Sequence, residues 1–406
     1  MSRSSFVLSA LGMVNALGVD TESVWRRLLK GDQGGIAFWD GLFPGQRVLV
    51  GRVPLEEGDI RFPLSLAHYR CRNNLLVLKA FEQIEDRVQR CVSLYGAERV
   101  GVVMGSSTSG VSATEAAFAA RRTTGQFPTD FFYVQHELGG VSEFLGKLAK
   151  LRGPCYTIST ACSSSAKAFA SARALLRDGW CDAVVVGGAD SLCRLTVEGF
   201  LSLEALSMDH SNSMSRNRDG FNIGEGAALF VLEKGNDGIE LAGVGESGDA
   251  HHMSAPSPDG QGAAAAITLA LTDAELIPQE VGYVNLHGTA TILNDQMEAR
   301  AVAGLFPQTP AGSTKGMTGH TLGAAGAMEV GICWLSLAHA EKEIASLPPH
   351  CWDGQKGDDL PPLNLVSLGS KIDLSGGSAF LSNSFGFGGS NCSVIIRRTK
   401  TPGRHP

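Results

Sequence analysis

Short apolar runs recur along the chain without polar alternation, and each is followed by glycine or serine. Three of them are "RVGVVMGSSTSG", which ends a strand near Met104, "DAVVVGGADS" and "VGYVNLHGTA". A strand that is apolar at every position is buried on both faces, as in a parallel sheet with helices on both sides. The pattern therefore predicts an α/β fold built on such strands.

Helical periodicity between these runs predicts five helices. They cover residues 75–95, 141–152, 166–178, 262–273 and 323–338. The richest apolar segment, "LGAAGAMEVGICWLSLAHA", contains Glu329, and no uninterrupted apolar run reaches the ~20 residues of a membrane span.

The N-terminal run "FVLSALGMVNALGV" follows Arg3 and has the length of a signal-peptide core. Gly12 and Asn15 interrupt it, and no A-x-A cleavage site follows before Asp20. A buried first strand with a glycine turn is the favoured interpretation.

Two segments share one order of features, which suggests two related halves. "YTISTACSSSAKAFASARAL" and "AGSTKGMTGHTLGAAGAMEV" both lead from a short strand through small polar residues into a small-residue helix. The turn-rich stretch at 233–240 is the natural seam. We therefore expect an N-terminal half at 1–234, a C-terminal half at 240–398 and a basic tail at 399–406.

Composition narrows the function. Hydrophobic residues make up 43% of the 406 residues and charged residues 18%, as in a compact enzyme-like chain. The net charge of -7 argues against binding to nucleic acid or to an anionic membrane surface. Nine cysteines without a C-x-x-C pair argue against a zinc site and a disulfide framework, and favour the reducing cytoplasm.

Cys162 stands out among these cysteines because it lies at the start of a predicted helix, surrounded by serines and threonines. Backbone N–H groups at a helix start favour an anion, so we expect a stabilised thiolate with a lowered pKa. Local context alone leaves a nucleophile and a small buried filler equally plausible.

His287 ends a predicted strand in "NLHGTATILNDQMEA", where it is followed by glycine and two threonines. Taken alone, a structural histidine is the more common case. Asp295 and Glu298 in the same stretch are expected to bind backbone or to cap a helix.

A third stretch, "STKGMTGHTLGAAGAMEV", supplies Lys315, His320 and Glu329. A helix start next to His320 should lower its pKa and keep the imidazole neutral. Lys315 and Glu329 could form an ion pair, which on a surface would contribute little. The turn "SFGFGGSN" is rich in glycine, but it lacks the spacing and the lysine of a phosphate-binding loop.

Five motifs occur together in a distinctive order: "TACSSS", "RDGFNIGEGAA", "HGTATILND", "KGMTGHTLGAAGAME" and "SFGFGGSN". In these the chain resembles the β-ketoacyl-[acyl-carrier-protein] synthases of type I/II, members of the thiolase superfamily, over nearly its whole length. The resemblance implies two similar five-stranded α/β halves in a five-layer αβαβα arrangement, usually as a dimer.

The resemblance also implies a role for each matching residue. Cys162 would accept the acyl group, His287 and His320 would complete a Cys-His-His triad, and Lys315 would stand beside them with Glu329 as its partner. Asp295 and Glu298 match a structural acidic pair. Further matches are the pantetheine-binding Thr289 and Thr291, the gate Phe387 and its neighbour Phe385, and the oxyanion-hole N–H groups of Cys162 and Phe387.

The implied reaction is a decarboxylative Claisen condensation of malonyl-carrier with the acyl group on Cys162. A thiolate suits it because sulfur is both a good nucleophile and a fair leaving group. No metal or redox cofactor is expected, since both substrates are thioesters on the phosphopantetheine of acyl carrier protein. The partner subunit would be a second copy or a ketosynthase-like chain, and the pathway a fatty acid, a polyene or another polyketide.

Some features depart from the family pattern or remain open. Ser213, Met214 and Ser215 replace the usual Pro-Phe-Asp before "RDGF". Thr108 falls where the family often sets chain length, and Phe132 in "FFYV" could reach the pocket across a dimer interface. Basic candidates for docking the acidic carrier are Arg70, Arg72, Arg121 and Arg122, although solvated helix charges are the favoured interpretation of these residues.

Three other functions fit less well. A degradative thiolase needs a second cysteine base, which "FGFGGSN" lacks. A non-catalytic chain-length factor would typically lack the nucleophile. A cysteine hydrolase would need water in the acyl pocket, and nothing in the sequence indicates that.

Overall fold

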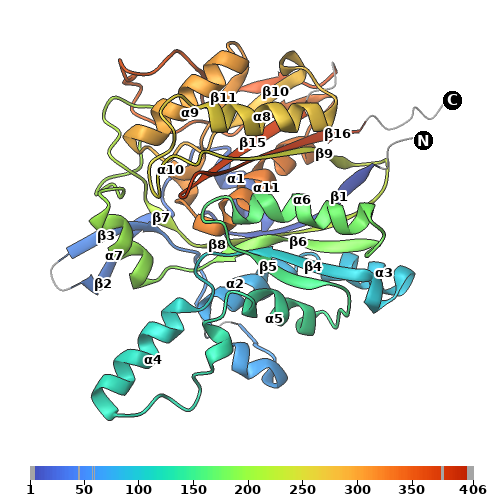
Figure 1. Cartoon of the computed structure of the whole chain (residues 1–406), viewed down its shortest axis with the longest axis vertical. Helices are drawn as coiled ribbons and strands as arrows, with labels where there is room; N and C mark the ends of the chain where they lie inside the picture. The colour runs from blue at the N-terminus through green and yellow to red at the C-terminus, as the bar shows by residue number, and fades with distance from the viewer. Residues whose placement is uncertain (1–4, 44–45, 57, 59, 376–378, 400–406) are drawn as a thin grey trace.

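Eleven strands form the central sheet of the computed structural model, which describes residues 5–43, 46–56, 58, 60–375 and 379–399 (Figure 1). The strand order is β13 (Asn364–Leu365), β11 (Pro310–Gly312), β10 (Val281–Asn285), β15 (Ala379–Gly386), β16 (Ser390–Arg398), β9 (Ile239–Gly248), β1 (Phe6–Val14), β8 (Gly226–Lys234), β6 (Ala183–Asp190), β4 (Val100–Gly105) and β5 (Cys155–Ile158). One residue pair, Val7 with Glu240, joins β1 to β9. The sheet therefore consists of two halves, each with five strands, and the C-terminal half carries the short β13 in addition.

The strands are parallel where β-α-β connections link them and antiparallel near the join. β4, β5 and β6 run parallel, as do β10, β11, β13 and β15. β1, β8, β9 and β16 pair antiparallel with their neighbours. The expectation of a parallel sheet is thus wrong near the join. For β15 and β16 the reason is the short turn between them, which allows only antiparallel pairing.

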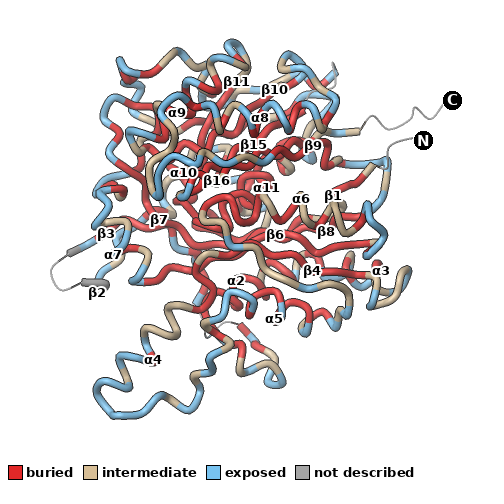
Figure 2. The backbone as a smooth tube through the Cα atoms, viewed as in Figure 1, coloured by how far each residue is buried: buried red, intermediate tan, exposed pale blue. Residues whose placement is uncertain are grey.

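Helices lie in three layers around the two halves. The outer N-terminal layer holds α2 (Arg72–Phe81), α3 (Glu85–Tyr95) and α5 (Gly140–Leu148), the middle layer α1 (Thr21–Leu28), α6 (Ser164–Arg177) and α11 (Ala325–Ala338), and the outer C-terminal layer α8 (Gln261–Ala274) and α9 (Ile292–Leu305). Alternate side chains of β6 face different layers: Val184 and Val186 pack toward the middle layer and Val185 toward the outer one. The result is the five-layer thiolase-like fold, buried through its centre (Figure 2).

Four of the five predicted helices are confirmed, but the predicted helix at 75–95 is two helices, α2 and α3. The break falls at Gln83, whose side-chain amide donates to the carbonyl of Met13 (3.2 Å) and accepts from its N–H (3.3 Å). These hydrogen bonds connect the residue at the helix break to the end of β1. The second helix, α3, begins after the buried Ile84. The helices α1, α4 (Val111–Thr124), α7 (Arg194–Ser202), α9 and α10 (Lys315–Thr318) were not anticipated from the pattern.

The ends of the chain follow the sequence interpretation in part. The N-terminal apolar run forms the buried strand β1. Within the described ranges, no helix combines the length and the apolar character that crossing a bilayer requires. Residues 400–406 of the predicted basic tail lie outside the described residues.

The two suspected echo segments end in α6 and α11, which touch at the centre of the molecule. The Ser165 hydroxyl accepts a hydrogen bond from the Ala327 N–H at 2.9 Å. A side chain at Gly326 would meet backbone, since its Cβ would lie 2.6 Å from the Ala166 nitrogen. The small residues of both helices therefore allow the closest approach, which brings the turns preceding them together.

Candidate active site

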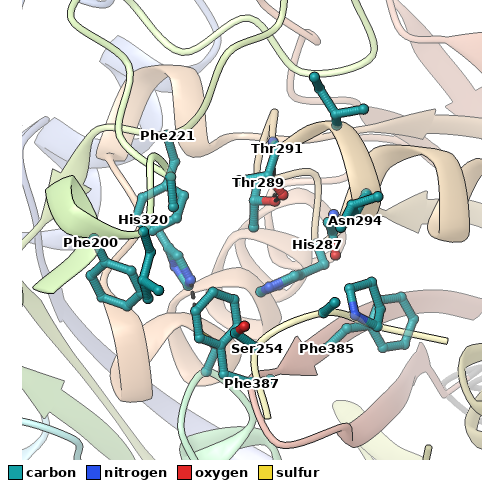
Figure 3. A pocket seen from close by; sticks show the side chains of 18 of the residues that line it. Phe200, Phe221, Ser254, His287, Thr289, Thr291, Asn294, His320, Phe385 and Phe387 are labelled. Carbon is teal, nitrogen blue, oxygen red and sulfur yellow. Dashed lines mark hydrogen bonds between the residues drawn. The ribbon is translucent and has the colours of Figure 1, made fainter. Parts of the chain in front are cut away.

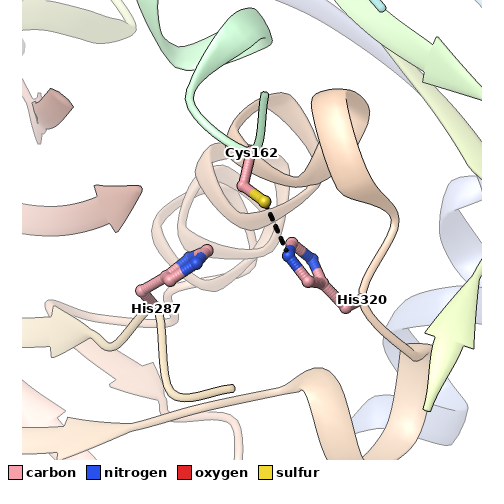
Figure 4. A group of neighbouring side chains, drawn as sticks. All are labelled: Cys162, His287 and His320. Atoms are coloured by element: carbon pink, nitrogen blue, oxygen red, sulfur yellow. Dashed lines mark hydrogen bonds between the residues drawn. The ribbon is translucent and has the colours of Figure 1, made fainter. Parts of the chain in front are cut away.

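Cys162 lies in the turn between β5 and α6, just before Ser163, the N-cap of the helix. The turn is held by Ser164, whose hydroxyl donates to the carbonyl of Ala161 at 2.6 Å. The Cys162 sulfur lies 3.1 Å from His320 Nε2, and it accepts a hydrogen bond from the backbone N–H of Phe387. Figure 4 shows the sulfur and His320 joined by this contact, with His287 from a third segment facing them.

Burial raises the pKa of the Cys162 thiol to about 11. The charge of Lys315 and the Phe387 N–H act in the opposite direction, but desolvation is the largest effect. The expectation of a lowered pKa is therefore wrong for this site without substrate, because the sulfur is buried as well as placed near a helix start. The resting group is a thiol, and its proton needs an acceptor when the sulfur reacts.

His320 is the neighbouring acceptor. Burial lowers its pKa well below the ordinary value, and the charge of Lys315 lowers it further, so the ring is neutral. The prediction of a neutral imidazole is confirmed, although burial is the main cause. Phe221 contacts the ring edge-on at a centroid distance of 4.9 Å, and the backbone carbonyl of Asn222 accepts from the backbone N–H of His320 at 2.7 Å. Nδ1 of the ring has no hydrogen-bond partner among the described residues.

His287 follows the end of β10 and faces His320, with ring centroids 5.2 Å apart and planes at 84°. Lys315 Nζ lies 3.2 Å from His287 Nδ1. A lysine ammonium can only donate, so Nδ1 accepts and the ring proton resides on Nε2. Burial lowers the pKa of His287 well below its ordinary value, with Lys315 and His320 adding to the effect.

Lys315 and Glu329 form a buried pair rather than the surface pair considered from the sequence. Both side chains are nearly inaccessible, at 2% and 4% exposure. Lys315 Nζ also donates to the carbonyl oxygen of His287 at 2.5 Å. Burial raises the pKa of Glu329 to about 7, against the opposing effect of Lys315. The lysine is thus held between a carboxylate from α11 and two acceptors on His287.

Asp295 and Glu298 on α9 bind backbone, as their expected structural role requires. Glu298 accepts from the N–H groups of His287 and Gly288, both at 2.7 Å. Asp295 accepts from Met214 N at 2.7 Å and from Ala290 N at 3.1 Å. The two carboxyl groups therefore fix the turn that carries His287.

A cavity of about 300 Å³ opens onto the three reactive side chains (Figure 3). Thr289 and Thr291 line it, with their hydroxyls 2.9 Å apart, as does Phe385. The ring of Phe387 packs edge-on against Phe200, 5.6 Å between centroids, at the position of the predicted gate. Other lining residues are Leu203, Glu204, Ala205, Asp219, Phe221, Asp249, Ser254, Ala255, Pro256, Ile292, Leu293, Asn294, Gly386, Gly389 and Asn391.

The backbone segments that carry the two N–H groups of the predicted oxyanion hole, those of Cys162 and Phe387, approach each other closely. A Cβ on Gly386 would lie 3.2 Å from the Cys162 nitrogen, so this backbone runs directly against the nucleophile. The next N–H, that of Phe387, points at the sulfur. A carbonyl oxygen bound here would meet donors from both segments.

Sequence reasoning missed several lining residues. Phe221 lies within the quoted "RDGF" motif, which was its only signal. Phe200 lies on α7, a helix that the hydrophobic periodicity did not predict. Asp249 lies in a loop without a recognisable sequence pattern, and it accepts a hydrogen bond from Asn391 Nδ2 at 2.6 Å. These contacts depend on the tertiary arrangement.

Other predicted site residues lie elsewhere. Thr108 is buried with its hydroxyl donating to Asp190 at 2.8 Å, and Phe132 is exposed on the arm around α4; neither lines the cavity. Arg72 is buried, pairing with Glu225 at 2.6 Å, and so cannot dock a carrier. Arg70, Arg121 and Arg122 are exposed, and their docking role stays a prediction.

The reactive trio is also the one group among the described residues whose ligand atoms could share a metal ion. The donor atoms of Cys162, His287 and His320 lie within 4.8 Å of one another. The Lys315 ammonium beside His287 adds a positive charge that opposes a bound cation.

Comparison with known proteins gives consistent matches over the chain. Residues 72–238 match the model of the beta-ketoacyl synthase N-terminal domain, and residues 239–344 match that of the C-terminal domain. A "3-oxoacyl-[acyl-carrier-protein] synthase 2" from Vibrio harveyi is 32% identical, with 98% of this chain and 99% of that protein covered.

Solved structures agree with this. A ketosynthase (ApeO) from Xenorhabdus doucetiae, solved in complex with its chain length factor (ApeC), is 41% identical with a TM-score of 0.91, covering 97% of this chain and 98% of that one. A beta-ketoacyl synthase from Burkholderia phymatum is 27% identical with a TM-score of 0.87, covering 98% and 100%.

Proposed function

This chain belongs to the beta-ketoacyl synthase family of acyltransferases, and we propose that it is a 3-oxoacyl-[acyl-carrier-protein] synthase that condenses malonyl-carrier with an acyl group held on Cys162. The observation that carries the proposal is the contact of 3.1 Å between the Cys162 sulfur and His320 Nε2, opposite a His287 ring whose tautomer Lys315 fixes. Thiol, proton acceptor and second donor are thus present in one cavity.

The first half-reaction is acyl transfer. The Cys162 sulfur attacks the thioester carbonyl, and its proton passes to His320 Nε2, which is neutral and can accept it. The N–H groups of Cys162 and Phe387 stabilise the tetrahedral oxyanion. As the intermediate collapses, the carbon–sulfur bond to the carrier breaks, and His320 returns the proton to the leaving pantetheine thiolate.

The second half-reaction forms the new carbon–carbon bond. Loss of carbon dioxide from the malonyl group leaves an enolate, whose oxygen accepts hydrogen bonds from the two Nε2–H groups of His287 and His320. No described residue is a hydrogen-bond partner of His320 Nδ1, so the ring is free to change its tautomer. It accepts at Nε2 in the first step with its own proton on Nδ1, and it donates from Nε2 in the second step after that proton has moved to Nε2. The enolate carbon then attacks the acyl-Cys162 carbonyl, and the sulfur leaves as a thiolate. A 3-oxoacyl-carrier two carbons longer is released, and the thiolate takes up one proton from solvent to restore the resting thiol.

The chain itself supplies the groups for both steps, so we propose that no metal or redox cofactor takes part. The substrates carry their own activation as thioesters on phosphopantetheine. We place the enzyme in the cytoplasm, the compartment that its nine free cysteines favour. Its product would enter fatty-acid or polyketide chain elongation.

For the partner we favour a ketosynthase-like subunit over a second copy. One edge of β5 pairs with β4, while no strand among the described residues pairs with its other edge. The arm around α4 extends from the body and exposes Phe118, Phe127 and Tyr133 (Figures 1 and 2). These surfaces suit a partner, and the 41% identical ketosynthase was solved with its chain length factor.

Two alternatives lose support at the site. A non-catalytic chain-length-factor role would leave the complete Cys162–His287–His320 arrangement without use. A degradative thiolase would need a cysteine base in the cavity. Cys392, the cysteine nearest in sequence to the glycine-rich motif "FGFGGSN", lies on β16 in the apolar core and does not line the cavity.

The test is to incubate the purified chain with acyl-carrier and malonyl-carrier, once alone and once after co-expression with a ketosynthase-like partner subunit. Mass spectrometry then identifies the carrier-bound products. A 3-oxoacyl product that is absent with Cys162→Ala supports the proposal. No product from either preparation, despite acylated Cys162, would overturn it. Sedimentation of the chain alone as a stable, fully active homodimer would overturn the choice of partner.

A further inference from the structure

A third buried histidine, His350, lies outside the cavity and joins two segments that support it. Its Nδ1 accepts from the backbone N–H of Ser313 at 3.0 Å, and its Nε2 donates to the carbonyl of Ser213 at 2.9 Å. The side chain is almost fully enclosed, at 5% exposure. Both ring nitrogens are therefore used, and the tautomer is fixed.

The Ser313 side of this bridge leads to the reactive groups. The Ser313 hydroxyl donates to the carbonyl of Gly288 at 3.0 Å and accepts from the Lys315 N–H at 3.3 Å. Ser313 thus contacts both the residue after His287 and the backbone of the lysine that holds the His287 ring.

The Ser213 side leads to the same turn by another route. The Ser213 hydroxyl and the Met214 N–H donate to one oxygen of Asp295, at 3.1 and 2.7 Å. The other oxygen accepts from Ala290 N at 3.1 Å. Ser213 and Met214 belong to the stretch that departs from the family motif.

The Ser313 and Ser213 segments both pack directly against Gly288. Gly288 has φ +42°, and a Cβ there would lie 2.5 Å from the Ser313 Cβ and 2.9 Å from the Ser213 hydroxyl. No space is left between the segments, so a shift of either one moves the backbone next to His287. The imidazole of His350 is the side chain that ties them together.

We propose that His350 is a positioning residue: the hydrogen bond that its Nδ1 accepts from the Ser313 N–H sets the distance between Lys315 and His287, and so aims the Nε2–H of His287 at the enolate oxygen. The idea rests on the proposed condensation. The bridge requires a neutral ring, because a protonated Nδ1 could not accept from Ser313, and burial lowers the pKa of His350 to about 4.

Two substitutions separate the two ends of the bridge. His350→Asn places an amide oxygen where Nδ1 accepts from Ser313, while His350→Gln reaches toward Ser213 and leaves the Ser313 N–H unpaired. We expect His350→Asn to retain malonyl-carrier decarboxylation within about threefold of wild type. His350→Gln should lose about 10–100-fold, the effect of a small misplacement of a reacting group.

Two further readouts distinguish positioning from general stability. Acylation of Cys162, which does not use His287, should stay unchanged in both variants, and the ¹⁵N shifts of His287 should show an altered tautomer balance in His350→Gln only. Equal losses of decarboxylation in both variants, or a parallel loss of Cys162 acylation, would overturn the proposal. If the wild-type chain does not decarboxylate malonyl-carrier, the proposed function fails, and the ¹⁵N spectrum still decides whether His350 controls His287.

Discussion

Replacing Lys315 by methionine separates two roles that one ammonium group combines. Lys315 Nζ contacts Glu329, the His287 carbonyl and His287 Nδ1, all inside the protein. Methionine has a similar length but no N–H. The variant Lys315→Met therefore removes the charge that balances Glu329 and the donor that fixes the His287 tautomer.

The two roles predict different magnitudes. Leaving one member of a buried ion pair alone typically costs about 3–5 kcal/mol of unfolding free energy. Adding Glu329→Gln removes the uncompensated charge, so the double variant should recover more than half of that loss. Catalysis should not recover, since His287 can now carry its proton on Nδ1; losing one such donor costs about 3–4 kcal/mol, or about 100–1000-fold in rate.

Urea unfolding and malonyl-carrier decarboxylation, measured on wild type, Lys315→Met and the double variant, test this. The pKa of Glu329 is already raised to about 7 and should rise further without the lysine. The stability loss of Lys315→Met should therefore be smaller at about pH 6, where the carboxyl group takes up a proton, than at about pH 8. Recovery of decarboxylation in the double variant would refute the tautomer argument.

Three further predictions follow from the site and its surroundings. Cys162→Ala should abolish acyl loading, seen by mass spectrometry, while carbon dioxide is still released from malonyl-carrier, because both histidines remain; loss of both would contradict the assignment of steps. Arg72→Met should destabilise the fold by about 3–5 kcal/mol in urea unfolding, because Glu225 would lose its buried partner, whereas Arg122→Met at an exposed position should change stability by no more than about 0.5 kcal/mol. The stability difference between wild type and His350→Asn should shift against wild type by about 3 kcal/mol as the pH falls from 6.5 to about 4, since over that range only the unfolded chain protonates His350. A difference independent of pH would mean that His350 takes up its proton in the fold at the same pH as in the unfolded chain.

The arrangement of the site was predictable from the order of the motifs along the chain, but not from the residues around each candidate. Local patterns around Cys162 and His287 left a filler and a structural histidine as serious alternatives. Only the joint order of the motifs implied that these residues meet, and the structure places Cys162 3.1 Å from His320. Helix periods gave the positions of α5, α6, α8 and α11 within a few residues, because the apolar faces of these helices pack on the sheet, but they did not indicate five other helices.

What the sequence could not provide depends on burial. The pKa of Cys162 rises because the surrounding fold excludes water, which no neighbouring residue type reveals. Arg72 resembles a surface arginine until Glu225, 153 positions away in sequence, is placed against it. The helix break at Gln83 arises because that side chain bonds to the end of β1, again a contact between distant segments.

The contact between Gly326 and Ala166 has a consequence for how such an enzyme can diversify. The nucleophile precedes one of these helices and its proton acceptor precedes the other, so their spacing is set where two backbones touch at the middle of the molecule. Loops, docking faces and pocket walls lie farther out and can change without altering that spacing. Substrate preference and partner proteins can thus change through the outer loops and surfaces, while the geometry of the bond-forming step stays the same.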